Sequence, residues 1–149
     1  MSKRIYTVVL QSEIGDGATQ SSETFFYDWS QIPDVPYYVR FSFTSSVTTI
    51  VRSGQVAMLY VDLSQPNNHI AKPKSSAQYS NRSQYLGNIM YGTTTGNTYL
   101  YAENNTNPPT YLNGRPKSNN FTVEIRSTQT TYFTPFVGVY SLILSFQEC

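Results

Sequence analysis

The stretch VYSLILSF, Val139–Phe146, alternates large apolar side chains with serine over most of its length. Successive side chains of a β-strand point to opposite faces of the sheet, so this alternation predicts a half-buried strand. The side chains predicted to face the core are Tyr140, Leu142, Leu144 and Phe146. Those predicted to face outward are Ser141, Ser145 and Gln147.

Seven more short runs of this kind precede it, and turn residues separate them. The predicted strands are Arg4–Gln11, Glu23–Trp29, Tyr37–Thr44, Gln55–Leu63, Gln84–Tyr91, Asn97–Glu103 and Phe121–Ser127. The run Gln55–Leu63 is almost wholly apolar, which predicts a strand that is covered on both faces. No segment shows a helical period. About eight strands in a chain of this length predict an all-β fold, a single antiparallel β-sandwich of jelly-roll type that forms one domain over residues 1–149. Periodicity does not give the order of the strands.

The composition is unusual in its low charge. The 149 residues carry a net charge of +1, and only 13% are charged, about half the usual fraction. Such a neutral polar surface favours association, so it suits a protein that works inside an assembly. The basic clusters, such as Lys72 with Lys74, are small, and we expect no nucleic-acid binding. No apolar run approaches the roughly 18 residues of a membrane span, and the N-terminus has the pattern of a strand rather than of a signal peptide.

The residues that could carry chemistry are few. Cys149 is the single cysteine, so no intrachain disulfide can form and a free thiol is expected. His69 is the single histidine, and a solvated loop residue is the expected role because a metal site would need further ligands. Asp16, in the triplet GDG, lacks the spaced oxygen ligands of a calcium loop.

Acidic residues and sequons give no stronger indication. Asp62 could lie beside Glu103 or Glu124 as a glycosidase-like carboxylate pair, but any chain with nine acids offers such pairs. No G-x-S-x-G motif is present. We therefore expect no catalytic residue, no metal and no cofactor, and the protein is not expected to be an enzyme. Three sequons, at Asn81, Asn104 and Asn120, are expected by chance in a chain so rich in Asn, Ser and Thr.

The segment NNTNPPTYLNGRPKSNNFTVEI, Asn104–Ile125, has the character of a stiff connection. Pro108 and Pro109 fix the backbone and remove two donors, which keeps the chain extended and rules out an interior strand. The pair Asn113–Gly114 predicts a turn with positive φ at the glycine. A preorganised segment loses little entropy on docking, so we predict an interface formed by Pro108, Pro109, Tyr111 and Arg115. A structural crossover between two strands explains the same residues equally well.

Tyrosines are frequent, with 13 in the chain. In predicted strands and loops they could form a platform on which sugars stack, as in a lectin, or they could pack in the core or in an interface. Core and interface are the commoner positions. The residues concerned are Tyr37, Tyr38, Tyr60, Tyr79, Tyr85, Tyr91, Tyr99, Tyr101 and Tyr111.

The second half of the chain also carries a resemblance. Four elements carry it: YLG at Tyr85–Gly87, NPPTYL at Asn107–Leu112, RPKSNNFTVEI at Arg115–Ile125 and YSLILSFQE at Tyr140–Glu148. Together they resemble small capsid proteins of large icosahedral nucleocytoplasmic DNA viruses, such as those that infect algae. The resemblance implies a single jelly roll that serves as a minor capsid protein, either as cement between major capsomers or at a vertex.

The function expected from the residues and from the resemblance is therefore that of a structural virion component. Its expected location is the capsid, and its expected partners are the major capsid protein, other capsid proteins and copies of itself. The alternative is a carbohydrate- or receptor-binding module on the virion surface. A signalling sandwich of the TNF-like kind is a third possibility.

Overall fold

A computed structural model describes residues 3–13, 22–46, 57–63, 85–94, 97–127 and 139–149. Within these residues the chain forms nine strands and one short 3-10 helix, η1, at Trp29–Gln31. The strands are β1 Ile5–Gln11, β2 Ser22–Phe26, β3 Tyr37–Ser45, β4 Ala57–Val61, β5 Tyr85–Thr94, β6 Asn97–Ala102, β7 Thr110–Leu112, β8 Asn120–Ser127 and β9 Tyr140–Glu148.

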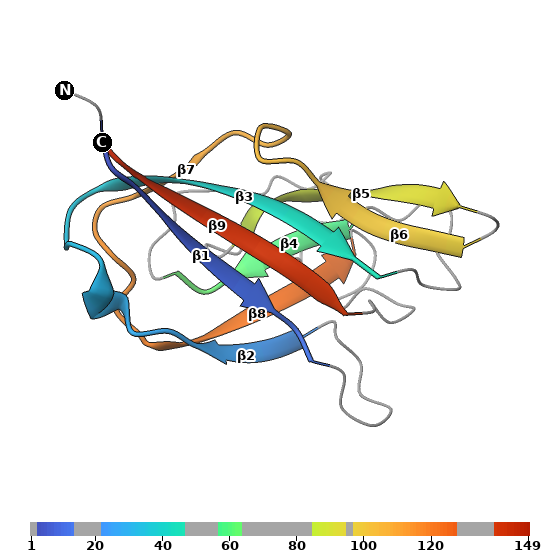
Figure 1. The fold of residues 1–149 in the computed structure, drawn as a ribbon, viewed down its shortest axis with the longest axis horizontal. Coiled ribbons are helices and arrows are strands. Elements are labelled where there is room, and N and C mark those ends of the chain that lie inside the picture. Colours follow the sequence, from blue (N-terminus) through green and yellow to red (C-terminus); the bar gives the residue numbers. More distant parts are fainter. Residues whose placement is uncertain (1–2, 14–21, 47–56, 64–84, 95–96, 128–138) are drawn as a thin grey trace, which may run out of the picture.

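The strands form two packed layers (Figure 1). The first sheet has the order β1-β9-β3-β6, and the second has the order β2-β8-β4-β5. All neighbouring strands are antiparallel. The first strand thus pairs with the last and the second with the last but one, which is the winding of a jelly roll. The predicted all-β fold of jelly-roll type is confirmed.

The two sheets are joined along one side by β5. Its first half pairs with β4 in the second sheet, and its second half, Met90–Thr94, pairs with β6 of the first. A register shift lies in the β4–β5 ladder between Leu59 and Tyr60. Strands that switch sheets commonly do so through such bulges.

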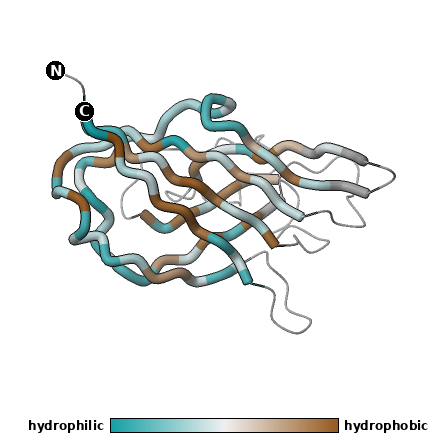
Figure 2. Tube along the Cα trace, in the orientation of Figure 1, coloured by the Kyte–Doolittle hydropathy of each residue, from teal (hydrophilic) through white to brown (hydrophobic). Residues whose placement is uncertain are grey.

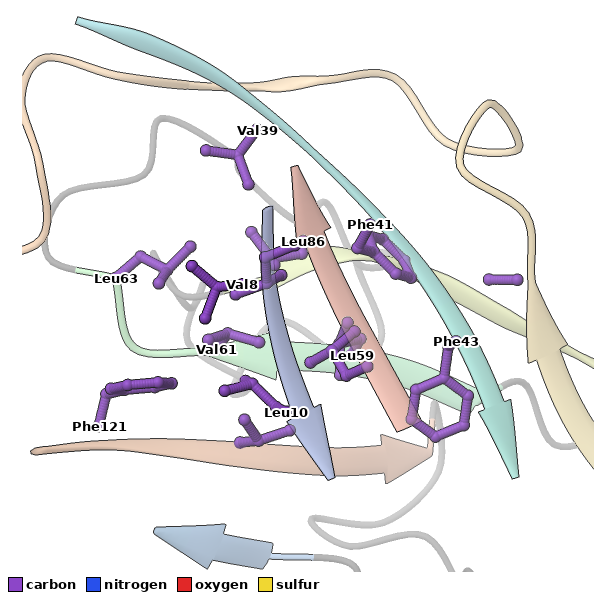
Figure 3. Packing of buried hydrophobic residues seen from close by; sticks show 14 of the residues in the cluster. Val8, Leu10, Val39, Phe41, Phe43, Leu59, Val61, Leu63, Leu86 and Phe121 are labelled. Carbon is purple, nitrogen blue, oxygen red and sulfur yellow. The ribbon is translucent and has the colours of Figure 1, made fainter. Parts of the chain in front are cut away.

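The core lies between the layers and takes residues from both. Figure 3 shows Val8 and Leu10 of β1 and Phe41 of β3 in one cluster with side chains of β4, such as Leu59. Along the chain, hydrophobic colour gathers in the strands where the sheets overlap, and the turn after β6 is hydrophilic (Figure 2).

The faces predicted from alternation are confirmed. The four inward side chains of β9 are at most 2% exposed. In β3 the buried set is Tyr37, Val39, Phe41 and Phe43, and in β8 it is Phe121, Val123 and Ile125. All five residues of β4 are buried, as expected for a strand covered on both faces.

Two local predictions differ from the structure. The strand predicted over Glu23–Trp29 ends at Phe26, because Asp28 accepts hydrogen bonds from Ser30 N (3.1 Å) and Ser30 Oγ (2.7 Å) and so starts η1. This turns Trp29 into the core, where it contacts Phe121 and Phe146. The second difference is β7, which the pattern did not predict.

Candidate docking and binding sites

The docking segment, by which we mean Asn107–Arg115 with the four predicted interface residues, begins with a side chain that extends a β-ladder. Asn107 Oδ1 accepts from Asn88 N at 3.0 Å, and Asn107 Nδ2 donates to Asn88 O at 3.0 Å. The Asn107 amide thus pairs with the backbone of β5 at Asn88, two residues before β5 begins to pair with β6 at Met90. Gly87 makes the approach possible, because a Cβ at this position would lie 2.5 Å from Asn107 Cγ. Two of the sequence elements quoted above, YLG and NPPTYL, are therefore in contact.

The proline pair leads into β7. Pro108 is exposed and Pro109 is half-buried. The next three residues, Thr110–Leu112, pair antiparallel with the first residues of β3. Leu112 is fully buried and Thr110 is 1% exposed, so the predicted interface segment also supplies buried side chains to the fold.

Tyr111, between these two buried residues, points outward. It lies opposite Tyr38 of β3, and the two ring centroids are 5.8 Å apart at an angle of 63°. Tyr38 is 44% exposed and Tyr111 is half-buried. The predicted contact residue Tyr111 is thus accessible on the outer face of the first sheet.

Arg115 lies elsewhere and makes contacts within the chain. Its Nη1 donates to Ile32 O at 3.1 Å, and its backbone N–H donates to Asp34 Oδ1 at 3.2 Å. Gly114 leaves space for that carboxylate, since a Cβ there would lie 2.8 Å from Asp34 Oδ1. The predicted positive φ at Gly114 is wrong: the glycine is required for this close approach, not for a left-handed backbone. Arg115 therefore clamps the β7–β8 connection onto the β2–β3 connection.

A cleft of about 490 Å³ lies between these two connections. Its lining residues carry carboxylate, amide, guanidinium and ammonium groups. The lining residues are Asp28, Trp29, Ser30, Asp34, Asn113, Gly114, Arg115, Pro116, Lys117 and Asn119. Of the four predicted interface residues, only Arg115 belongs to this cleft.

The cleft is held by hydrogen bonds from both sides. Asn119 Oδ1 accepts from Trp29 N at 3.1 Å, and Asn119 O accepts from Tyr27 N at 2.9 Å. Hydrogen bonds from the Ser30 hydroxyl and N–H keep the pKa of the Asp28 carboxyl below its ordinary value. Among the described residues, the buried Trp29 Nε1 finds no hydrogen-bond partner. The walls are preorganised, and charges of both signs lie close together.

A second candidate surface is the outer face of the first sheet, which we call the tyrosine face. We define it by Tyr38, Tyr99, Tyr101 and Tyr111 together with the exposed apolar residues Ile5, Val9 and Met90. The rings of Tyr99 and Tyr101 on β6 are 5.6 Å apart. Ile5, Val9 and Met90 are between 48% and 60% exposed. Among the described outward residues of β1, β3, β6, β7 and β9, Arg40 is the one charged side chain.

The other residues weighed in the sequence form no further site in the described part of the chain. Asp62 follows β4 and lies near Glu124, which is opposite Tyr60 on β8, whereas Glu103 follows β6 in the other sheet. No group of three or more potential metal-ligating side chains occurs among the described residues. No described helix is long and apolar enough to span a membrane.

Three further residues weighed in the sequence lie on the surface. Asn104 and Asn120 are exposed, and Cys149 is an exposed free thiol. Another set of predictions lies outside the described residues: His69, Asp16, Asn81 and the predicted loop Ser64–Ser83.

In comparisons with known proteins, the chain matches no family model and no curated protein.

Sequence reasoning missed the partners of the docking segment. Asp34 and Ile32 are far from Arg115 in sequence, and only the tertiary fold brings them together. Asn107 and Gly87 were both noticed as parts of motifs, but no local pattern shows that they touch.

Proposed function

We propose that the protein is a structural, non-enzymatic component of a virion, a minor capsid protein that stabilises an icosahedral shell through protein–protein contacts. The observation that carries the proposal is the tyrosine face. Interfaces are depleted of charge at their centre and enriched in tyrosine, and this face combines both features with exposed apolar side chains. The resemblance of the second half of the chain to small capsid proteins supports the same function.

The jelly roll places Tyr111 where a partner can reach it. The short strand β7 is fixed by backbone pairing with β3, so the Tyr38–Tyr111 pair is held in place before binding. A preorganised pair loses little conformational entropy when a partner docks. The partner proposed for this face is the major capsid protein, and the proposed location is the capsid.

The experiment compares incorporation into virus particles with the stability of the free protein. Tyr38→Ala combined with Tyr111→Ala should remove at least about 2 kcal/mol of binding, a factor of roughly 30 in affinity, if this pair is central to the interface. The copy number in purified particles should fall accordingly. The thermal midpoint of the free protein should change little, because both rings lie on the outer face.

Two single variants provide controls. Phe26→Ala removes an aromatic ring that is 69% exposed on the other sheet and should leave incorporation unchanged. Arg115→Ala should lower the midpoint, since it removes the hydrogen bond to Ile32 O. Normal incorporation of the double tyrosine variant, or loss of incorporation in Phe26→Ala alone, would place the contact elsewhere and contradict the proposal.

The cleft favours a second candidate function, a carbohydrate-binding module. Planar carboxylate, amide and guanidinium groups hydrogen-bond well to neighbouring hydroxyls, and a few such groups around a concave site fix the orientation of a small ligand. The cleft is lined by groups of all three kinds.

Trp29 gives this second function a direct test, because it is the single tryptophan in the chain and lines the cleft. Titration with glucose, galactose, mannose and N-acetylglucosamine should shift its fluorescence if a sugar binds there. Arg115→Ala should abolish the shift, whereas Arg40→Ala, on the tyrosine face, should retain it. Unchanged fluorescence with all four sugars would contradict carbohydrate binding in this cleft.

A further inference from the structure

β1 forms one edge of the first sheet. Within the described residues it pairs only with β9. The flanking hydrogen bonds of this ladder come from even-numbered positions: Glu148 N donates to Arg4 O, and Ser12 N donates to Tyr140 O, each at 2.9 Å. In an antiparallel pair, successive residues point their backbone groups alternately toward and away from the partner. The N–H and C=O groups of the odd-numbered residues of β1 therefore point along the open edge.

This edge lacks the usual protection against pairing with another strand. Sheets commonly protect their edges with proline, charged side chains or bulges. β1, with the sequence IYTVVLQ, contains no proline and no charged residue, and its ladder with β9 shows no register shift. The other edge strand, β2, carries Glu23 on its inward-facing side. Within the described residues, the odd-numbered positions of β1 itself, from Ile5 to Gln11, thus offer a row of backbone donors and acceptors to another strand. The next odd-numbered donor, Glu13 N, already donates to Glu23 Oε1 at 3.3 Å.

We propose that β1 pairs antiparallel with β1 of a second copy of this chain, about a two-fold axis at Val8, so that the first sheets of the two copies become continuous. In this register Thr7 faces Val9 of the second copy, and Ile5 faces Gln11. Each odd-numbered residue of β1, whose N–H and C=O point to the open edge, then lies opposite an odd-numbered residue of the second copy. The donors of one copy thus meet the acceptors of the other, as strand addition requires.

Charge complementarity favours this register. It also favours a second copy of the chain as the source of the strand that pairs with β1. With the axis at Val8, exposed Lys3 faces exposed Glu13 of the second copy, and symmetry repeats the pair. An axis at Thr7 would place Lys3 opposite Gln11, and an axis at Val9 would place Glu13 opposite Ile5. Opposite charges directly across a ladder stabilise it, and like charges destabilise it.

The test is the oligomeric state of the purified protein, measured by sedimentation equilibrium over a wide range of concentration. The chain alone has a mass of 16.9 kDa, and we expect a concentration-dependent shift to twice that mass. Thr7→Lys combined with Val9→Lys places lysines directly opposite each other across the two-fold axis. This variant should weaken the dimer by more than about tenfold.

A charge reversal tests the register itself. Thr7→Glu combined with Val9→Lys places each new carboxylate opposite a new ammonium and should restore the dimer. Ser42→Lys combined with Thr44→Lys, on the outer face of β3 away from the edge, is the matched control and should leave the dimer intact.

Three outcomes would overturn the proposal: a monomer at all concentrations, a dimer that survives the double lysine change in β1, or a dimer lost in the control. Failure of the charge reversal to restore a dimer lost in the double lysine variant would overturn the Val8 register. The measurement needs no virus particle, so its result is independent of the proposed capsid function.

Discussion

Two buried tyrosines in the core differ in the partner of their hydroxyl group. Tyr37 donates to Pro33 O, whereas the buried hydroxyl of Tyr140 has no hydrogen-bond partner in the part of the chain that the structure describes. A buried polar group that makes no hydrogen bond is destabilising, so the hydroxyl of Tyr140 reduces the stability of the fold. The ring itself packs well, since it stacks on Phe43 at 5.1 Å.

This difference predicts opposite effects of the same chemical change. Tyr140→Phe should raise the free energy of unfolding by about 1 kcal/mol, and the thermal midpoint by about 2–4 °C, because it removes only the unpartnered group. Tyr37→Phe should lower the free energy of unfolding by about 1 kcal/mol, because it leaves Pro33 O without its donor. Calorimetry of the two variants beside the parent protein measures both shifts. A loss of stability in Tyr140→Phe would show that its hydroxyl has a partner in solution.

At the scale of elements, the contact between the Asn107 side chain and β5 ties the β6–β7 connection to the point where β5 changes sheets. Gly87→Ala should destabilise the protein by about 1–2 kcal/mol, because the new methyl group would displace the Asn107 amide or press on Phe41. Asn107→Ala should cost about 1 kcal/mol through its two lost hydrogen bonds. The double variant should be less destabilised than the sum of the two, since both changes break the same contact. Denaturant unfolding of all four proteins gives the coupling, and simple additivity would contradict it.

The strands also differ in whether the sequence alone predicts them. Alternation predicted eight strands, and the buried faces of β3, β8 and β9, because alternation is a local property of the chain. It missed β7 because Thr110–Leu112 is too short to show a period and exists through its pairing with β3. It placed Trp29 in a strand, although the Asp28–Ser30 capping pair was present as a local indication. The contact of Arg115 with Ile32 could not be predicted, because nothing near Arg115 specifies which distant carbonyl it meets.

For the whole molecule, the buried tyrosines predict sensitivity to alkali. Burial raises the pKa of Tyr37 to about 12 and also raises the pKa values of Tyr85 and Tyr140 above the ordinary 10.0. A raised pKa means that the folded state holds the phenolic proton more tightly than the unfolded state does. The associated stability is therefore complete below pH 10 and is lost as the pH rises from about 10 to 12.

The thermal midpoint should accordingly fall above pH 10, together with the appearance of tyrosinate absorbance. A Tyr37→Phe and Tyr140→Phe double variant should show a shallower decline over the same range, because two of the coupled protons are gone. A parent protein whose midpoint does not change up to pH 12 would contradict the prediction.

The position of β5 in both sheets makes the two sides of the sandwich unequal. On the β5 side, backbone hydrogen bonds continue from one layer to the next. On the opposite side, between β1 and β2, the described contacts are made by side chains, such as the Glu23 carboxylate that accepts from Glu13 N and the Phe25 ring against Tyr140. Partial opening of the native state should therefore start on the β1–β2 side and leave the β4–β5–β6 ladder protected. In amide hydrogen exchange, the backbone of β2 should become labelled well before that of β5, and a ligand or partner that spans β1 and β2 would slow exchange across the whole open side.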